Sequence, residues 1–366
     1  MNISKIQYHR GMFLKPVVAD EVVKIINKFD QNKSPGHDDI GNFVAKKVAD
    51  VISKPLTDIF NTSLSIGIVP EQLKIAKVIP IYKKEDAEVF SNYRPVSVLP
   101  CFSKILERLV FNRCMNYIDR NNILNKRQFG FRPKHSTYMA VIELVDKIAN
   151  AVERNESTVG IFLDLSKAFD TINHDILLYK LEFYGIRGVA LDWFKSYLTD
   201  RKQFVRYQMH DSDYKTIECG VPQGSILGPL LFILYVNDIV NTTSLLESIL
   251  FADDTTLLFS HPNIELQNDL INKELSEICN WFQANKLSVN ASKTNYMVLG
   301  THHNTTKFID ANQDTSVIFK TDAPSNIEKH KLNIQLDGES LSRVSSTKFL
   351  GVIIDENLTW RNHIDV

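Results

Sequence analysis

Adjacent aspartates at 253 and 254 are the residues of this sequence whose type and spacing most clearly suggest chemistry. Apolar residues run into the pair from Ile249 and away from it to Phe259, which predicts a β-hairpin with both carboxylates at its tip. Adjacent like charges repel, so a fold keeps them together only where something positive neutralises them. Carboxylate oxygens favour Mg²⁺ or Mn²⁺, and one hairpin offers too few ligands, so we expect a third carboxylate elsewhere in the chain.

Asp164 is the best candidate for the third carboxylate, because it follows an apolar run, 159–163, that reads as a buried strand. A lone aspartate at this position would more often cap the following helix. Taken with Asp253 and Asp254, the metal-binding interpretation is favoured. Three carboxylates at the ends of neighbouring strands can hold two metal ions about 3.5–4 Å apart, which is an arrangement used for phosphoryl transfer.

The composition allows a protein with several packed subdomains. The chain has 366 residues, of which 44% are hydrophobic, and its net charge is −1. Its four cysteines are widely separated and form neither a zinc pattern nor a disulfide framework, which favours a reducing compartment. The first ten residues lack a signal-peptide core, and the longest apolar stretch, 229–236, is too short to span a bilayer.

Two segments, 126–135 and 201–207, mix cations with aromatic residues. Such a mixture suits a nucleic-acid strand, because cations pair with phosphates while aromatic rings stack on bases or sugars. A solvated loop and a solvated strand edge explain the same residues equally well, so both interpretations stay open for each segment.

Strand and helix patterns alternate along the chain, and hairpins interrupt them, which predicts an α+β or mixed α/β class. Helical patterns cover 20–29, 42–64, 101–121, 137–153, 173–184, 188–198, 227–240 and 265–285. Strand patterns cover 76–82, 93–99, 159–163, 296–299 and 348–354, and a further hairpin is expected from 204–209 and 215–219. Residues 302–337 are polar and poorly patterned, which predicts an insertion or flexible link.

Blocks of sequence spread over nearly the whole chain point to one family. They are 34–38, 79–83 with 92–95, 128–132, 162–170, 220–229, 251–254 and 350–352. In their order and spacing these blocks resemble the reverse transcriptases of non-long-terminal-repeat (non-LTR) retrotransposons, most closely the jockey-like subgroup. The resemblance implies an RNA-directed DNA polymerase that uses two Mg²⁺ ions, with Mn²⁺ as an alternative. It also implies an RNA template, a DNA primer and deoxynucleoside triphosphates (dNTPs) as partners, with no membrane involved.

The same resemblance implies a right-hand polymerase of α+β class, with fingers, an antiparallel palm sheet and a truncated thumb. We expect an N-terminal helical extension at 1–70, fingers and palm at 71–300, and a linker with a partial thumb at 301–366. The chain then reads as a fragment of a longer retrotransposon protein. Action in the nucleus is implied by the family alone, since the sequence contains no targeting signal. The oligomeric state stays unknown.

Carried over to this sequence, the family pattern assigns metal binding and catalysis to Asp164, Asp253 and Asp254. Phe251 stands where the family more often has tyrosine, which removes a hydroxyl group but leaves the carboxylates in place. The residues expected to bind the incoming dNTP are Lys83, Arg94, Leu165, Phe169, Gln223 and Gly224. Lys293 is expected near the pyrophosphate, as a general acid or as electrostatic support.

Each of these assignments has a structural alternative. Phe169 would exclude a ribose 2′-hydroxyl as a steric gate, or it is a core residue at the start of a helix. Gln223 and Gly224 would contact the nucleotide, or they form a plain turn before a helix. Lys83 and Arg94 would hold the triphosphate, or they are surface charges, and Lys84 is as well placed as Lys83.

Two other functions compete with RNA-directed DNA synthesis. One is a non-catalytic, nucleic-acid-binding remnant of a decayed element, which the short thumb segment suggests. The other is an RNA-templated RNA polymerase, which shares the paired aspartates but disagrees with a bulky Phe169.

Overall fold

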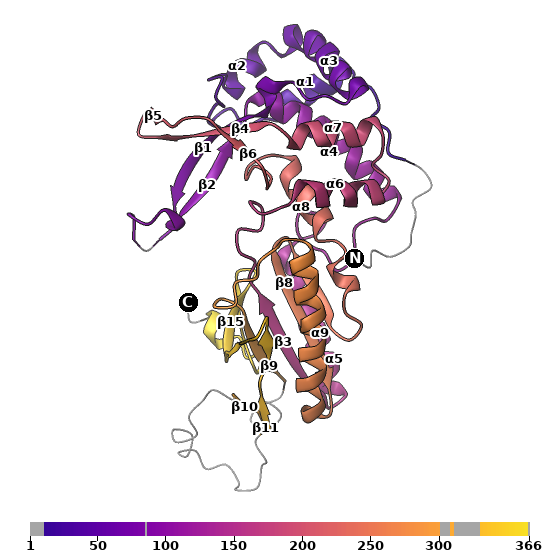
Figure 1. The fold of residues 1–366 in the computed structure, drawn as a ribbon, viewed down its shortest axis with the longest axis vertical. Coiled ribbons are helices and arrows are strands. Elements are labelled where there is room, and N and C mark those ends of the chain that lie inside the picture. The colour runs from indigo at the N-terminus through magenta and orange to yellow at the C-terminus, as the bar shows by residue number, and fades with distance from the viewer. Residues whose placement is uncertain (1–10, 85, 301–307, 311–329, 365–366) are drawn as a thin grey trace. The chain divides into compact units, whose positions relative to one another are not determined.

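The computed structural model describes residues 11–84, 86–300, 308–310 and 330–364, and Figure 1 draws the chain as a ribbon. The chain forms two compact units, each built from separated stretches of sequence. Of the described residues, the helical unit contains those from 11 to 124 and from 169 to 236, and the sheet unit contains those from 125 to 168 and from 237 onward. The class is mixed α+β, as the sequence predicts.

In the helical unit, α-helices pack on one another and beside a small sheet. Its helices are α1 (Ala19–Asn27), α2 (Asn42–Lys47), α3 (Ala49–Ile66), α4 (Cys101–Arg120), α6 (His174–Phe183), α7 (Val189–Leu198) and α8 (Leu227–Tyr235), with 3₁₀ turns η1 (Glu71–Lys74) and η2 (Phe90–Asn92). Its strands are β1 (Ile75–Tyr82), β2 (Tyr93–Val98), β4 (Arg201–Tyr207), β5 (His210–Asp211) and β6 (Lys215–Ile217).

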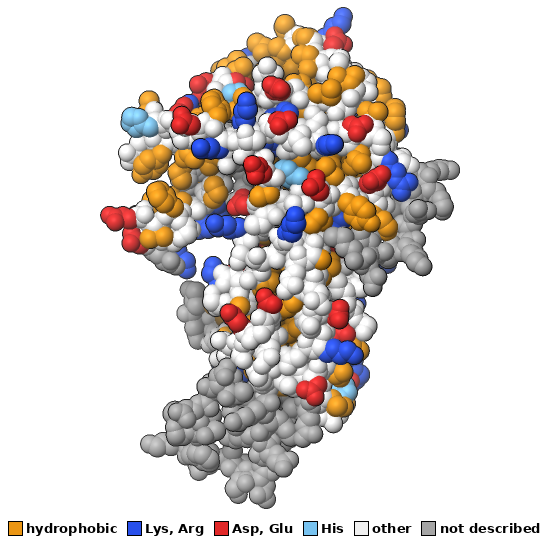
Figure 2. Space-filling model, viewed as in Figure 1, with side chains coloured by type: hydrophobic (Ala, Val, Ile, Leu, Met, Phe, Trp, Pro, Cys, Tyr) orange, Lys and Arg blue, Asp and Glu red, His pale blue; other side chains and the backbone are white. Residues whose placement is uncertain are grey.

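The sheet of the helical unit is centred on β1, which pairs antiparallel with β2 and parallel with β4. Strand β6 pairs antiparallel with β4, but through residues 201–203 rather than the expected 204–209, because residues 206–207 pair with β5. Apolar side chains also remain on the surface of this unit, and Figure 2 shows them gathered over α2 and α3. They include Phe43, Val44, Val51, Ile59 and Ile66. No described helix is both long and apolar enough to cross a membrane.

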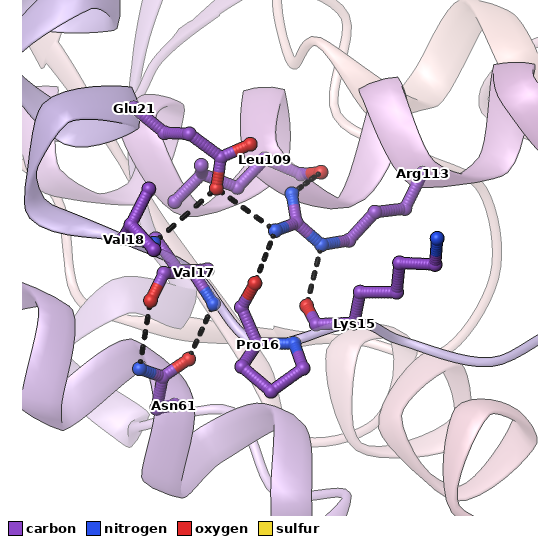
Figure 3. Close-up of polar contacts among 8 residues, drawn as sticks. All are labelled: Lys15, Pro16, Val17, Val18, Glu21, Asn61, Leu109 and Arg113. Atoms are coloured by element: carbon purple, nitrogen blue, oxygen red, sulfur yellow. Dashed lines mark hydrogen bonds and ion pairs between the residues drawn. The ribbon is translucent and has the colours of Figure 1, made fainter.

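The extended segment before α1 is fastened to the helices by side chains that bond its backbone (Figure 3). The Asn61 amide accepts from the Val17 N–H at 2.6 Å and donates to the Val17 carbonyl at 3.0 Å. The Arg113 guanidinium donates to the carbonyls of Lys15 and Pro16, and it forms an ion pair with Glu21 at 3.0 Å. These bonds give backbone groups of an irregular segment the hydrogen-bond partners that a strand would find in its ladder.

The sheet unit is built around an antiparallel core of β9, β3, β8 and β7, with β14 added parallel to β9. Its strands are β3 (Ser157–Leu163), β7 (Glu247–Phe251), β8 (Asp254–His261), β9 (Asn295–Leu299), β10 (Phe308–Asp310), β11 (His330–Leu332), β12 (Gln335–Leu336), β13 (Glu339–Ser340), β14 (Ser342–Arg343), β15 (Ser346–Phe349) and β16 (Val352–Asp355). Its helical elements are α5 (Thr137–Glu153), η3 (Ile239–Asn241), α9 (Ile264–Ala284) and α11 (Arg361–Ile364).

Strand β3 lies inside this sheet, paired with β8 on one edge and β9 on the other. Helix α5 packs against one face, where Leu144 and Ile148 meet Leu258 and Met297 in the core. Side chains alternate along β3, so Ile161 points to the face away from Leu258 and Met297. Ile161 is buried as well, so the sheet is covered on both faces. This burial explains why the β3 sequence is continuously apolar rather than alternating.

The structure corrects four of the predicted elements. The helix expected over 42–64 is two helices, because Val48 has φ −111° and ψ 11° and turns the backbone between them. The helix expected over 227–240 ends at Tyr235. The strand expected over 348–354 is a hairpin of β15 and β16, whose turn residues Leu350 and Gly351 both have positive φ. Hydrophobic periodicity does not encode such turns.

The fourth correction concerns 302–337, which was expected to be an insertion or flexible link. Part of this stretch lies outside the described residues. Its described part contains β10 paired parallel with β11, and then β12, so it is not without regular structure.

Candidate active site

Strands β7 and β8 form a tight hairpin, and Phe251 and Asp254 are its last pair. Ala252 and Asp253 are therefore the two turn residues, and Asp254 is the first residue of β8 rather than part of the tip. Ala252 has φ 58°, a left-handed conformation that alanine adopts only at an energetic cost. The acidic pair thus stands on a strained two-residue turn.

Asp164 follows the last residue of β3, and the sheet register brings it to the same edge. Leu163 pairs with Thr255, so the next position along places Asp164 opposite Asp254. Opposed residues on antiparallel strands have Cα atoms about 4.5–5.5 Å apart. The backbone of Asp164 is also fixed by a neighbouring loop, because its carbonyl accepts from Asn290 N–H at 2.8 Å and its N–H donates to the Thr294 hydroxyl at 3.3 Å.

The charges of Asp253 and Asp164 act on the carboxyl group of Asp254. Partial desolvation, and then the charges of Asp253 and Asp164, raise the pKa of Asp254 to about 6. Within the described ranges, however, no three His, Cys, Asp or Glu side chains are gathered into a cluster that could hold a metal ion. The donor set itself, three carboxylates with excess negative charge, fits a hard divalent cation.

Phe169, Gln223 and Gly224 come together in the helical unit, where the loops 169–172 and 220–224 are bonded to each other. The Val221 N–H donates to the Phe169 carbonyl at 2.9 Å. The Gln223 amide donates to both oxygens of Asp170 at 3.1 Å. The Phe169 ring stacks on Phe232 with centroids 4.7 Å apart. The Phe169 side chain is half-buried, so one part of the ring packs and another stays accessible.

Gly224 occupies a position that no other residue could fill without a backbone shift. Its φ is 124°, and a Cβ added there would lie 2.4 Å from the Ser97 carbonyl oxygen. The loop is pinned at the same place by a backbone bond of 2.8 Å from the Ser97 N–H to the Gln223 carbonyl. This close approach ties the loop 220–224 to β2.

Lys83 and Arg94 lie on the β1–β2 hairpin, and both are exposed. Ile81 pairs with Arg94, and the Lys83 N–H continues the ladder by donating to the Asn92 carbonyl at 2.9 Å. Because side chains alternate along a strand, Lys83 and Arg94 lie on the same face, diagonally across the pair. Lys84 is the next residue and lies in a bend beyond the paired residues. The ladder therefore sets Lys83, but not Lys84, beside Arg94.

Leu165 and Lys293 lie in the sheet unit, close in the fold to the backbone of Asp164. Leu165 forms an isolated bridge with Val289, and the Lys293 side chain projects from the loop 290–294 as an exposed residue. The candidate residues therefore divide between two units, each described separately. The sheet unit holds Asp164, Leu165, Asp253, Asp254 and Lys293, and the helical unit holds Lys83, Arg94, Phe169, Gln223 and Gly224.

The two cation-rich segments mostly serve the fold. Arg201 is completely buried and lies over the Tyr197 ring at 4.7 Å. Arg206 makes two 2.6 Å bonds to the Asp211 carboxylate. Arg132 donates to the backbone carbonyls of Asn125 and Gln128. Arg201 fits neither interpretation left open by the sequence, because a completely buried side chain is neither solvated nor available to a nucleic acid.

Sequence reasoning gave no role to two buried polar residues that hold the candidate site. Gln128 bonds the turn at Ala252, and Glu107 bonds the first residues of α8, directly after the loop 220–224. Gln128 belongs to the block 128–132, to which the family resemblance assigns no role. The signal for Glu107 was an acidic residue on the apolar side of a helix, where a charge needs buried partners.

Comparison with known proteins decides the family. The family of reverse transcriptases (RNA-dependent DNA polymerases) matches residues 81–354 of this chain. The chain belongs to the reverse transcriptase family. This match includes every candidate residue from Lys83 to Lys293, and reverse transcriptases generally use divalent metal ions.

Among the relatives of this reverse transcriptase domain are proteins of fly retrotransposons. The RNA-directed DNA polymerase from mobile element jockey of Drosophila funebris is 32% identical, over 95% of this chain and 36% of that protein. The probable RNA-directed DNA polymerase from transposon BS of Drosophila melanogaster is 30% identical, over 96% of this chain and 37% of that protein. The chain thus spans little more than a third of the length of these relatives.

Proposed function

We propose that this chain catalyses RNA-directed DNA synthesis for a jockey-like, non-LTR retrotransposon. The reaction joins the α-phosphorus of a dNTP to the 3′-oxygen of a primer and releases pyrophosphate. The observation that supports it best is the register that sets Asp164 opposite Asp254, beside Asp253, in a chain of this family. The proposed partners are an RNA template, a DNA primer and dNTPs.

In this proposal Asp164, Asp253 and Asp254 hold two Mg²⁺ ions, or Mn²⁺ in their place. Bound divalent ions would supply charge neutralisation and activation of the primer 3′-hydroxyl. The chain's own contribution is alignment, because strands β3 and β8 fix the Cα positions of Asp164 and Asp254 through their hydrogen-bonded ladder. Lys293, on the loop that fixes Asp164, would protonate or electrostatically support the leaving pyrophosphate.

The remaining candidates would bind the nucleotide. Lys83 would supply a point charge and Arg94 a planar fork for the triphosphate oxygens. Phe169, supported from behind by Phe232, would exclude a 2′-hydroxyl. Gln223 and Gly224 would line the nucleotide with polar backbone and side-chain groups, and Leu165 would contact its apolar parts.

We assign the sheet unit to the palm of a right-hand polymerase and the helical unit to its fingers. The palm assignment is supported by the antiparallel core of β9, β3, β8 and β7, which carries the aspartates. The division into an extension at 1–70, fingers and palm at 71–300 and a partial thumb at 301–366 stays a prediction.

Primer extension on an RNA template tests the function. The purified chain with Mg²⁺ and dNTPs should lengthen a labelled DNA primer, and Asp253→Asn should lower the rate by about a hundredfold or more, because it removes charge where charge develops. Asp58→Asn is the matched control, an exposed aspartate on α3 that should leave the rate unchanged. Template binding without incorporation in Mg²⁺ or Mn²⁺ would favour the non-catalytic remnant. Equal use of ribonucleotides would favour RNA synthesis.

A further inference from the structure

A short segment ahead of α5 runs along the free edge of β7. The Phe129 N–H donates to the Leu250 carbonyl at 2.7 Å, and the Leu250 N–H donates to the Arg127 carbonyl at 2.9 Å. Gln128 and Leu250 are thereby bridged in parallel. Strand β7 is held on both edges, by β8 and by residues 127–129, just before its chain enters the turn at Ala252 and Asp253.

The side chain of Gln128 reaches that turn. It is completely buried, and its Oε1 accepts from the Gly130 N–H at 2.8 Å and from the Ala252 N–H at 3.0 Å. Two N–H donors facing one amide fix its orientation, because Nε2 cannot accept from either. Nε2 is left buried with no hydrogen-bond partner among the residues that the structure describes. Gln128 thus leaves one of its own groups unsatisfied while it supplies an acceptor to the turn.

Gly130 packs against the backbone of the same turn residue, Ala252, because it has no side chain. A Cβ at position 130 would lie 2.1 Å from the Ala252 nitrogen and 2.8 Å from its Cα. Only glycine allows the two backbones to approach this closely. One residue of the segment thus supplies the hydrogen bond, and the other supplies the space.

The turn requires support because Ala252 is strained. A positive φ in alanine persists only where the surroundings over-determine the conformation. The Gln128 bond to Ala252 holds the strained turn at the residue immediately before Asp253.

We propose that Gln128 is a positioning residue, which keeps the Ala252–Asp253 turn in its strained form so that Asp253 and Asp254 face Asp164. This inference rests on the proposed function, in which those carboxylates bind divalent ions. Gln128 touches neither substrate nor metal in this proposal. It acts through the backbone of the turn, as residues behind a ligand set commonly do.

Replacement of Gln128 by methionine tests the proposal, because methionine keeps the length and volume but has no strong acceptor. Mn²⁺ affinity of the purified chain, measured by calorimetry, should fall about 10–100-fold, the usual effect of losing a group that orients ligands. The Mn²⁺ concentration for half-maximal primer extension should rise in proportion. The thermal midpoint measured in EDTA reports any general loss of stability separately.

Gln267→Met is the matched control. Gln267 is another completely buried glutamine of the sheet unit, and its amide donates to the carbonyls of Ser157 and His261 at 2.8 Å each. Those residues form the β3–β8 pair at the end of the ladder far from Asp164. This variant should lower the thermal midpoint but keep the wild-type Mn²⁺ affinity. Gln128→Asn, which is one methylene shorter, gives an intermediate loss of affinity and decides the case if the methionine variant does not fold.

The inference is overturned if Gln128→Met keeps the wild-type Mn²⁺ affinity, or if Gln267→Met loses as much. A wild-type chain that binds Mn²⁺ but extends no primer contradicts the proposed function, and the Mn²⁺ affinities of the variants still judge the role of Gln128. A wild-type chain that binds no Mn²⁺ removes both proposals.

Discussion

The side chains of the candidate site differ in how strongly their surroundings constrain them. Burial, and then the nearby charges of Asp253 and Asp164, raise the pKa of Asp254 to about 6, so the fold disfavours the charged form of this carboxyl group. Stability would favour separating these charges, and residues kept in such a conflict are candidates for function. Lys83 and Arg94, by contrast, are exposed on one face of the β1–β2 hairpin.

The shared face of Lys83 and Arg94 gives a prediction at the scale of one residue. Lys83→Ala should raise the KM for dNTP by about tenfold, since a charge-assisted bond to phosphate contributes about 1.5–3 kcal/mol. Lys84→Ala is the matched control, because it removes the same charge at the next residue, which lies beyond the paired residues of the hairpin. Steady-state primer extension with varied dNTP measures both. A larger effect of Lys84→Ala would reverse the assignment.

Among the elements, α4 holds α7 and α8 together through one buried carboxylate. Glu107 accepts from the backbone N–H groups of Ile226 and Leu227, at the start of α8, and from the Tyr197 hydroxyl at 2.9 Å. An anion at a helix N-terminus is favourable because unpaired N–H groups point at it. Since α8 follows the loop 220–224 directly, Glu107 also fixes where that loop ends.

Glu107 makes stability depend on pH. Burial raises its pKa above the ordinary value, although the charge of Arg201 and the N–H groups of α8 oppose the shift. A folded-state pKa above the unfolded one means that the folded chain binds the proton more tightly. This stabilisation is complete below the unfolded pKa of about 4.3 and is lost as the pH rises through the folded value.

Glutamine at position 107 does not titrate. The difference in free energy of unfolding between the wild type and Glu107→Gln should therefore follow the titration of Glu107. The free energy of unfolding of the wild type should decrease relative to that of the variant as the pH rises from about 4.3, by at most about 1.4 kcal/mol per pH unit. Urea unfolding at several pH values measures it. A difference that is constant, or that grows in favour of the wild type with pH, would contradict the raised pKa.

At the scale of the whole molecule, the candidate metal ligands and most of the candidate nucleotide ligands belong to different units. Each unit has its own core, so each can respond to its own ligand. The sheet unit carries all three aspartates, while Lys83 and Arg94 belong to the helical unit.

Hydrogen exchange should therefore distinguish the two ligands. Mg²⁺ alone should slow amide exchange around 163–165, 251–255 and 289–294 of the sheet unit, because bound ions relieve the repulsion that opens this edge. It should leave the β1–β2 hairpin of the helical unit unchanged until dNTP and primer–template are added. Asp253→Asn provides the control, since it should abolish the Mg²⁺ effect. Protection by Mg²⁺ in the hairpin alone would contradict the division of ligands.

Much of this protein can be predicted from its sequence, because the features concerned are local. The apolar run 159–163 and the hairpin around 253–254 predicted β3, β7 and β8, since strand burial and tight turns depend on neighbouring residues. The ordered blocks, from 79–83 to 350–352, indicated the reverse transcriptase family, and the family match confirms it. The break at Val48 and the turn at Leu350 escaped prediction, because they depend on backbone angles that periodicity does not encode.

Only the tertiary structure decided which residues face each other on paired strands and which side chain supports the turn at Ala252. The β3–β8 register sets Asp164 opposite Asp254, the β1–β2 register sets Lys83 beside Arg94, and a buried Gln128 side chain reaches Ala252. The two partners in each contact come from different segments of the chain, and a shift of one residue in a strand's register would change which side chains meet. Shifting a strand by one residue moves each of its side chains to the opposite face, and no local pattern fixes that choice.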